Sequence, residues 1–180
     1  MVFARDEQAA SKLCQAWREH GEVSKIYLAI VKDWPPFHKE NQLEGRIDEP
    51  LAPSEERLKW KVQKNGKPCT TLWKIHGLSP PANSDSNSVV LQLTPLTGRT
   101  HQLRVHCAHI GSGIEGDSLY GDKCIKWKPQ QASTTVLCLH ARKLSFPHPR
   151  SGERMEFISL PSWYEMIPKT SSSDASSVTL

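Results

Sequence analysis

The residues best suited to chemistry lie in one short stretch, residues 96–106, where cationic side chains are closely spaced. His101 and Arg104 stand three residues apart, so they would share one face of a helix. Thr100 is the predicted N-cap of that helix, and the helix should stop at Gly111. A guanidinium fixed beside a helix N-terminus can hold an anion. The stretch therefore fits either an active site for an anionic substrate or a surface ion pair, and its composition leaves both open.

Two strands are expected to position this stretch. Residues 89–93 are apolar and β-branched, which is typical of a mostly buried strand, and they lead to a turn at Gly98. Residues 24–31 alternate, with aliphatic side chains on one face and Tyr27 on the other. From this pattern alone, Tyr27 is an ordinary strand tyrosine with its hydroxyl at the surface.

A third predicted strand is basic. Residues 57–64 alternate cations with apolar residues, so that Lys59 and Lys61 line one face. A row of lysines can protect a strand edge from aggregation, or it can follow a phosphate backbone, and both interpretations remain open. The Asn-Gly pair at 65–66 predicts a hairpin to a return strand at residues 69–75.

Further elements are predicted on either side of these strands. Residues 2–4 should form a brief strand, and Asp6 should cap the helix that follows. Four residues at helical spacing predict its buried face: Ala10, Leu13, Cys14 and Trp17. Residues 32–53, with four prolines and little periodicity, are expected to form a long connection.

The C-terminal third contains a strand with a change of phase. Within residues 136–146 the apolar residues switch parity, which predicts a β-bulge between Ala141 and Leu144. A final strand is predicted at residues 154–160. Residues 79–88 are polar and should form a loop.

Composition restricts the class of protein. The 180 residues suffice for one domain with a sizeable core. A balance of 23 basic against 19 acidic residues gives a net charge of +4, which is compatible with a polyanionic partner but does not identify one. Five scattered cysteines without a C-x-x-C pair indicate reduced thiols in an intracellular compartment. No segment has the length of a membrane span, so no membrane association is expected.

Other motifs are incomplete. His106 and His109 have a spacing that metal ligands can use, but no second acidic or thiolate pair accompanies them. Gly111 and Gly113 are not followed by the lysine and Ser/Thr of a phosphate-binding loop. The Gly-x-Ser-x-Gly motif of a serine nucleophile is missing as well. We therefore expect neither a metal nor a cofactor.

Five segments together resemble the motifs of RluA-type RNA pseudouridine synthases, the family that includes the ribosomal large-subunit enzymes. They are residues 25–29 (KIYLA), 66–71 (GKPCTT), 97–106 (TGRTHQLRVH), 116–121 (GDSLYG) and 139–149 (LHARKLSFPHP). Each segment alone is a weak signal, but the five stand in the order and approximate spacing of the family. The resemblance extends from residue 1 to about residue 161.

The sixth motif of this family, His-Arg-Leu-Asp-x-x-Thr-Ser-Gly with the catalytic aspartate, is missing from the 180 residues. Residues 1–5 resemble the strand that follows it, so the aspartate would lie before Met1. Asp6 is assigned to helix capping. We therefore expect the chain alone to be inactive, with water, Asp117 or Asp122 able to take up the guanidinium of Arg104.

The resemblance implies isomerisation of uridine to pseudouridine in structured RNA, without metal or cofactor. Arg104 would pair with the catalytic carboxylate and lower its pKa, and Tyr27 would pack against the uracil and accept a proton. Leu139 would line the pocket or serve as an ordinary core leucine. Further substrate contacts are expected from four side chains: Lys59, Lys61, Arg99 and His101.

The predicted fold is α+β, with a mixed, mainly antiparallel twisted sheet and two main helices. Residues 1–164 would form a pseudouridine synthase-like catalytic domain, incomplete at its N-terminus, and residues 165–180 a disordered serine-rich tail. The expected partner of a monomeric protein is ribosomal or transfer RNA. The expected location is the cytoplasm, or an organelle or the nucleus if a targeting segment precedes residue 1. The alternative function is a non-catalytic RNA-binding remnant or pseudoenzyme.

Overall fold

A six-stranded sheet, in which every described pair of neighbours is antiparallel, forms the centre of the fold. The computed structural model describes residues 2–19, 21–32, 42–78, 88–121 and 136–164. In spatial order the strands are β2 (Glu44–Asp48), β5 (Thr70–Leu78), β6 (Val89–Pro95), β1 (Ser24–Val31), β7 (Leu139–Pro147) and β8 (Arg154–Ile158). The remaining elements are a small sheet of β3 (Leu51–Pro53) and β4 (Trp60–Val62), and the helices α1 (Glu7–Arg18) and α2 (Gln102–His109). The predicted α+β class is confirmed.

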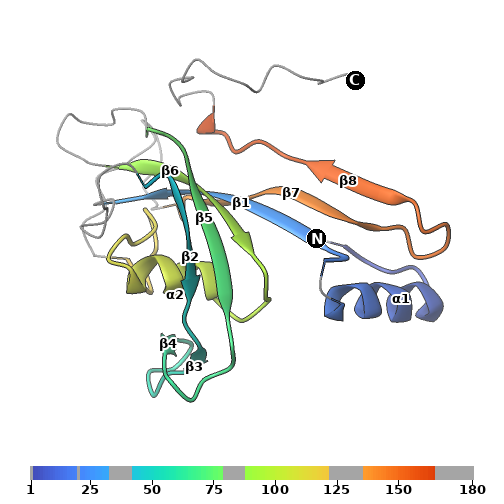
Figure 1. Ribbon diagram of the computed structural model, residues 1–180, viewed down its shortest axis with the longest axis horizontal. Coiled ribbons are helices and arrows are strands. Elements are labelled where there is room, and N and C mark those ends of the chain that lie inside the picture. Colours follow the sequence, from blue (N-terminus) through green and yellow to red (C-terminus); the bar gives the residue numbers. More distant parts are fainter. Residues whose placement is uncertain (1, 20, 33–41, 79–87, 122–135, 165–180) are drawn as a thin grey trace.

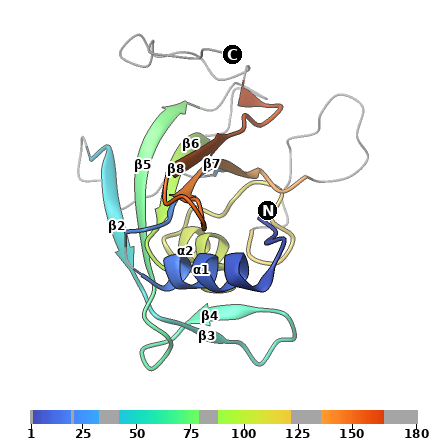
Figure 2. The same cartoon turned by 90° about the vertical axis from the view of Figure 1, so that its right-hand side faces the viewer.

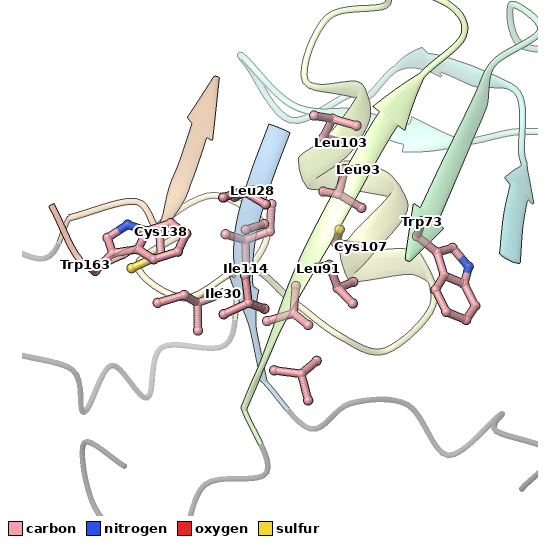
Figure 3. Close-up of a cluster of buried hydrophobic side chains, with 14 of the residues drawn as sticks. Leu28, Ile30, Trp73, Leu91, Leu93, Leu103, Cys107, Ile114, Cys138 and Trp163 are labelled. Carbon is pink, nitrogen blue, oxygen red and sulfur yellow. The ribbon is translucent and has the colours of Figure 1, made fainter. Parts of the chain in front are cut away.

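The central strands are buried because they are apolar on both faces. In β6, every residue from Val89 to Leu93 except Gln92 is buried, and residues 28–31 of β1 are fully buried. Figure 3 shows Leu93 close to α2, whereas Trp163 closes the opposite end of the same cluster. Because full burial of one such aliphatic side chain stabilises a fold by about 1.5–3 kcal/mol, these strands form the stable core on which the other elements pack.

Both helices lie on the same side of the sheet (Figures 1 and 2). His106 of α2 is hydrogen-bonded to Thr71 of β5, and Thr71 shares one face of that strand with Trp73 because side chains alternate. Trp73 is paired with Leu93, and Leu93 is paired with Tyr27. The helix α2 therefore covers the face of the sheet that carries Tyr27.

The helix α1 begins as predicted but buries a different face. Asp6 caps it by accepting a hydrogen bond of 2.8 Å from the backbone N–H of Ala9. Ala9 and Ala16 are buried, whereas Trp17, predicted to be buried, is 42% exposed. The ring of Trp17 instead lies 5.4 Å from that of Phe146, at the border of the contact.

Two local predictions are wrong. Residues 2–4 do not form a strand, because no described strand pairs with them. The connection predicted at residues 32–53 contains two strands, β2 and β3, of which β2 pairs with β5 at the edge of the main sheet. Residues 33–41 of that connection lie outside the described residues.

The hairpin predicted at residues 65–66 is also wrong. The basic strand is reduced to β4, which pairs with β3 rather than with β5. Leu58 has a φ of 67°, in the left-handed region, and this ends any regular strand before Lys59. Gly66 is needed for close packing instead, since a Cβ there would lie 2.6 Å from the carbonyl carbon of Leu51. Residues 51–62, the β3–β4 hairpin, lie beyond α2 in both views (Figures 1 and 2).

The β-bulge predicted in β7 is confirmed. Ile26 is paired with Lys143, and the next residue of β1, Tyr27, is paired with Ala141. Arg142 is therefore the extra residue, and it returns the apolar side chains that follow it to the face that carries α1.

Neither helix in the described part of the chain is long and apolar enough to cross a membrane. The four cysteines in that part are all free: Cys14, Cys69, Cys107 and Cys138. The loop predicted at residues 79–88, apart from Ser88, and the tail predicted at residues 165–180 lie outside the described residues. The domain boundary at residue 164 stays a prediction.

Candidate active site

A buried carboxylate holds Arg104 from one side. The Nε and Nη2 atoms of Arg104 donate to Asp117 at 2.7 and 2.6 Å, which is a bidentate pair. Asp117 also accepts hydrogen bonds from the backbone N–H groups of Leu119 and Tyr120 at 2.9 and 3.0 Å. The side chain of Asp117 is fully buried, and that of Arg104 is 16% exposed. Of the two carboxylates expected to take up the guanidinium, Asp117 does so, and Asp122 lies outside the described residues.

The surroundings of this pair keep both groups charged. Burial acts to raise the pKa of Asp117, but the hydrogen bonds from Arg104 and from the two backbone N–H groups outweigh it, and the pKa lies below its usual value. The hydrogen bonds to Asp117 raise the pKa of Arg104. A guanidinium bound through Nε and Nη2 still carries the two N–H bonds of Nη1, with which it can bind a second anion.

Tyr120 contacts the same arginine and two further elements. Its ring centre lies 5.1 Å from Cζ of Arg104, a distance at which a cation is attracted to an aromatic face. Its hydroxyl oxygen accepts a hydrogen bond of 2.8 Å from the backbone N–H of Trp60 and lies 2.8 Å from Nδ1 of His101. Tyr120 therefore joins the start of α2 to the β3–β4 hairpin.

The start of α2 differs from the prediction that Thr100 caps it. The N-cap residue is His101, which has a φ of 55° and makes no capping hydrogen bond with its side chain. Gln102 stabilises this end instead, because its Oε1 accepts from the backbone N–H of Arg99 at 3.0 Å and from the hydroxyl of Thr97 at 2.9 Å. His101 thus precedes the helix, and the left-handed backbone lets its ring meet Tyr120 rather than share a helix face with Arg104.

A buried chain of hydrogen bonds fixes α2 to the sheet. Gln102 donates to the hydroxyl of Thr71 at 3.0 Å, and that hydroxyl lies 2.9 Å from Nδ1 of His106. Nε2 of His106 lies 3.0 Å from the carbonyl oxygen of Glu49, which can only accept. The ring therefore carries its proton on Nε2, and burial lowers its pKa. Both nitrogens of His106 are used, which removes it as a metal ligand beside His109.

Tyr27 stands between α2 and a groove on the same face. It is half-buried, and burial raises the pKa of its hydroxyl. On the side of β6 it is paired with Leu93, and on the side of β7 it is paired with Ala141, which lines a groove of about 920 Å³. Residues 2–6, α1, β7 and β8 form the walls of this groove. Tyr27 and Arg104 thus lie on one face of the sheet, as a shared cleft requires.

The remaining predicted contacts are less enclosed. Leu139 is half-buried and packs against the main core, which leaves both of its predicted roles open. Arg99 is exposed, and its Nε donates to the carbonyl of Pro68 at 3.3 Å. Lys59 and Lys61 lie on the β3–β4 hairpin and pair with two glutamates of the same hairpin at 2.5 and 3.9 Å. Among the described residues, no group of three His, Cys, Asp or Glu side chains could hold a metal ion.

Two residues of this region were not singled out from the sequence. Tyr120 belongs to the motif at residues 116–121, and its place three residues after Asp117 was the available signal. Lys25 precedes Tyr27 by two residues in β1, so both lie on one face. Its Nζ donates to the carbonyl of Thr97 at 3.4 Å, and burial lowers its pKa. Lys25 thus adds a cation where β1 meets the turn before α2.

Comparison with known sequences places this geometry in a family. The profile of the RNA pseudouridylate synthase family matches residues 1–109. Ribosomal large subunit pseudouridine synthase C of Haemophilus ducreyi is 35% identical over 161 residues, which are 89% of this chain and 47% of that protein. The dual-specificity RNA pseudouridine synthase RluA of Pasteurella multocida is 33% identical over 165 residues, which are 91% of this chain and 68% of that protein. The chain thus spans about half the length of the first of these relatives.

Solved structures agree with this assignment. Human RNA pseudouridylate synthase domain containing 1 superposes with a TM-score of 0.69 at 26% identity, over 96% of this chain and 70% of the human one. Human RNA pseudouridylate synthase domain containing 4 gives a TM-score of 0.66 at 25% identity, over 92% and 68%. The fold and the site thus define a domain of the pseudouridine synthase type. The chain belongs to the RNA pseudouridylate synthase family, which confirms the resemblance in its motifs.

Proposed function

We propose that this chain supplies most of the active site of an enzyme that isomerises uridine to pseudouridine in RNA. The reaction detaches uracil from C1′ of the ribose, rotates it and rejoins it through carbon. A base within structured RNA has to leave its stack before an enzyme can reach that bond. The observation that carries the proposal is the enclosed guanidinium of Arg104, on the face of the sheet that also carries Tyr27.

Each of these two residues has a role that its surroundings favour. The Nη1 edge of Arg104 would orient the catalytic carboxylate and keep it ionised. Tyr27 would pack against the uracil, and the raised pKa keeps its hydroxyl protonated, which favours packing and hydrogen bonding over action as a phenolate base. Leu139 would contribute apolar surface from β7.

Asp117 is a poor candidate for the nucleophile. Its two oxygens already accept four hydrogen bonds, and its side chain is fully buried. We propose instead that the nucleophilic aspartate comes from a segment outside residues 1–180, for which the groove beside Tyr27 leaves room on the correct face. The chain alone would then not convert uridine.

The RNA substrate would be held mainly through its phosphates. Lys59, Lys61, Arg99 and His101 are the candidate contacts. The names of the relatives, a ribosomal large-subunit enzyme and a dual-specificity RNA enzyme, support an RNA substrate, and ribosomal or transfer RNA is the proposed class. A monomer is the proposed form.

A pseudouridine-specific chemical labelling assay tests the proposal. A uridine-containing stem-loop RNA is incubated with the 180-residue chain and with a version extended upstream by the segment that carries His-Arg-Leu-Asp. We expect turnover by the extended version only. In that version Arg104→Ala should abolish turnover, whereas Arg46→Ala, which removes an exposed arginine paired with Asp48, should not.

The same assay separates the alternatives. Turnover by the 180-residue chain would show that the catalytic acid lies within it. If neither version is active, the non-catalytic RNA-binding remnant is favoured. One observation favours the non-catalytic remnant: Arg104 already forms a bidentate pair with a carboxylate, that of Asp117.

A further inference from the structure

We propose that Tyr120 is a positioning residue that locks the β3–β4 hairpin to Arg104 and His101, and so sets the distance between the RNA-binding lysines and the active site. The inference rests on the proposed function, because it takes RNA as the ligand of the hairpin. It assigns to Tyr120 a role that involves the hydroxyl and the ring separately.

The hydroxyl of Tyr120 has a defined direction of hydrogen bonding. The backbone N–H of Trp60 can only donate, so the tyrosine oxygen accepts there, at 2.8 Å. The hydroxyl proton is then available to Nδ1 of His101, which lies 2.8 Å away and accepts it when the neutral ring carries its own proton on Nε2. The lowered pKa of His101, caused by burial and by the charge of Arg104, agrees with a neutral ring. In the tautomer that accepts from Tyr120, the ring presents its Nε2–H as a donor.

The point at which the hairpin is held is also the point at which it carries charge. Trp60 stands between Lys59 and Lys61, so Tyr120 fixes the backbone from which both lysines extend. The apolar side of the hairpin also packs against Val105 of α2, but such contacts are not directional and permit sliding. The carbonyl of Glu49, just before β3, is held by His106 of α2, and the hydrogen bond from Trp60 to Tyr120 adds a directional contact at β4, where the lysines lie.

The ring of Tyr120 completes the connection. The ring centre lies 5.1 Å from Cζ of Arg104. The backbone N–H of Tyr120 donates to one oxygen of Asp117, and Nη2 of Arg104 donates to the same oxygen. A displacement of Tyr120 is therefore shared by the arginine and by the hairpin. Phosphate contacts at Lys59 and Lys61 are thereby given a fixed spacing from Arg104.

The test uses Tyr120→Phe in the full 180-residue chain, because this change removes the hydroxyl and keeps the ring against Arg104. Amide hydrogen exchange in the absence of RNA should be roughly five- to tenfold faster at Trp60. The matched control is Tyr164→Phe, which removes another hydroxyl that bonds a histidine, His76 at 3.3 Å, beside another arginine. The control should leave exchange at Trp60 unchanged.

Binding of a fluorescein-labelled RNA stem-loop with unpaired uridines then measures the coupling. Four proteins are compared: the parent, Tyr120→Phe, the double variant Lys59→Ala/Lys61→Ala, and the triple variant. Tyr120→Phe should weaken binding about three- to tenfold. Removal of the two lysines should weaken binding less in the Tyr120→Phe background than in the parent, because the lysines are no longer held in place.

The outcomes are distinct. Unchanged exchange at Trp60 would contradict the positioning role of Tyr120 and leave the proposed function intact. The same holds if the losses in affinity caused by Tyr120→Phe and by the two lysine substitutions simply add in the triple variant. A parent chain that does not bind RNA would overturn both. Faster exchange at Trp60, together with non-additive losses in RNA affinity, supports the positioning role of Tyr120.

Discussion

At the scale of single residues, the Arg104–Asp117 pair should have the largest effect on stability. Replacing Asp117 by Ala would leave a largely enclosed guanidinium without its partner, and breaking a buried pair in this way costs about 3–5 kcal/mol. Since Arg104 keeps some exposure to water, we expect a loss near the lower limit, about 3 kcal/mol. Urea denaturation of parent and variant at pH 7 measures it.

The matched control for this prediction is Asp48→Ala. Asp48 also pairs with an arginine, Arg46, but both side chains are more than half exposed, and such surface pairs contribute little. The two variants should therefore differ clearly in their urea midpoints. Equal midpoints would mean that water replaces Asp117 without cost and that Arg104 is not enclosed in solution.

Residue-scale prediction from the sequence succeeded where alternation decides the outcome. Tyr27 lies on the face of β1 opposite to the aliphatic side chains, as the alternation along the strand predicted. Asp6 caps α1, which is the usual role of an aspartate just before a helix. Thr100 failed as a cap because the left-handed backbone of His101 starts α2 one residue later than predicted. In that conformation the ring of His101 contacts Tyr120, which lies further along the chain, so the local sequence carried no signal for it.

At the scale of elements, the attachment of α2 to the sheet should weaken as the pH falls. The pKa of His106 is lowered in the folded state, so the unfolded chain binds a proton more readily. The stabilising effect is complete above the unfolded pKa of about 6.5 and is lost as the pH falls below it, by at most about 1.4 kcal/mol per pH unit. Free energies of unfolding from urea titrations between pH 8 and pH 5 should show this slope.

Two variants assign that slope to its source. His106→Gln should lower stability at pH 8, because the hydrogen bonds to Thr71 and Glu49 are removed, and it should reduce the slope below pH 6.5. Thr71→Val, which removes the hydroxyl beside Nδ1 but keeps the buried imidazole, should also lower stability at pH 8 but should keep a slope below pH 6.5. His101 acts with the same sign, so part of the slope should persist in the His106 variant.

The loop between α2 and β7 offers a second prediction at this scale. Gly116 and Gly152 share a φ of 76°, but a Cβ on Gly116 would lie 1.8 Å from the carbonyl oxygen of Val136, whereas nothing lies within 4 Å of one on Gly152. Gly152→Ala should therefore cost about 1 kcal/mol, from backbone strain alone. Gly116→Ala should cost at least about 2 kcal/mol more, because the backbone must move.

Thermal unfolding of both glycine variants at the same pH makes the comparison. If both variants are destabilised equally, the approach of residue 136 to Gly116 does not persist in solution. Because Gly116 precedes Asp117, its alanine variant should also disturb the site around Arg104, which the Gly152 variant should not do.

Element boundaries were predicted well where one signal dominates and poorly where two compete. The bulge in β7 was predictable because the parity of the apolar residues changes along a single strand. The Asn-Gly pair at residues 65–66 gave a strong hairpin signal, yet β5 found its partners in β2 and β6. Long strands with apolar faces gain more from joining the main sheet than a short local turn can supply.

At the scale of the whole molecule, the sequence predicted the class and the family but not the path of residues 42–62. The five motifs all lie on the main sheet, on α2 or on the loops that join them. The position of β2 and β3 depends on pairing with strands distant in the chain, and their short lengths carry little periodic signal. The sequence therefore predicted the lysines of the β3–β4 hairpin, but it did not predict the hydrogen bond that joins this hairpin to Tyr120.

The last prediction separates local charge from net charge in RNA binding. The net charge of +4 gives every polyanion some attraction, so the removal of any two lysines lowers it equally. Bound phosphates release counterions, and the slope of log affinity against log salt should fall by about 0.7–0.9 for each phosphate that the protein no longer neutralises. Lys59→Ala/Lys61→Ala should therefore reduce the slope by up to about 1.5, with a similar reduction in affinity for all RNA sequences.

The control is Lys12→Ala/Lys74→Ala, which removes the same charge from exposed positions on α1 and β5. Its slope should stay close to that of the parent, because phosphates held at the hairpin do not reach these positions. Equal slopes for the two double variants would mean that net charge alone drives binding. If the hairpin variant instead binds RNA as tightly as the parent at low salt but aggregates more readily, the lysines protect a strand edge and do not bind RNA.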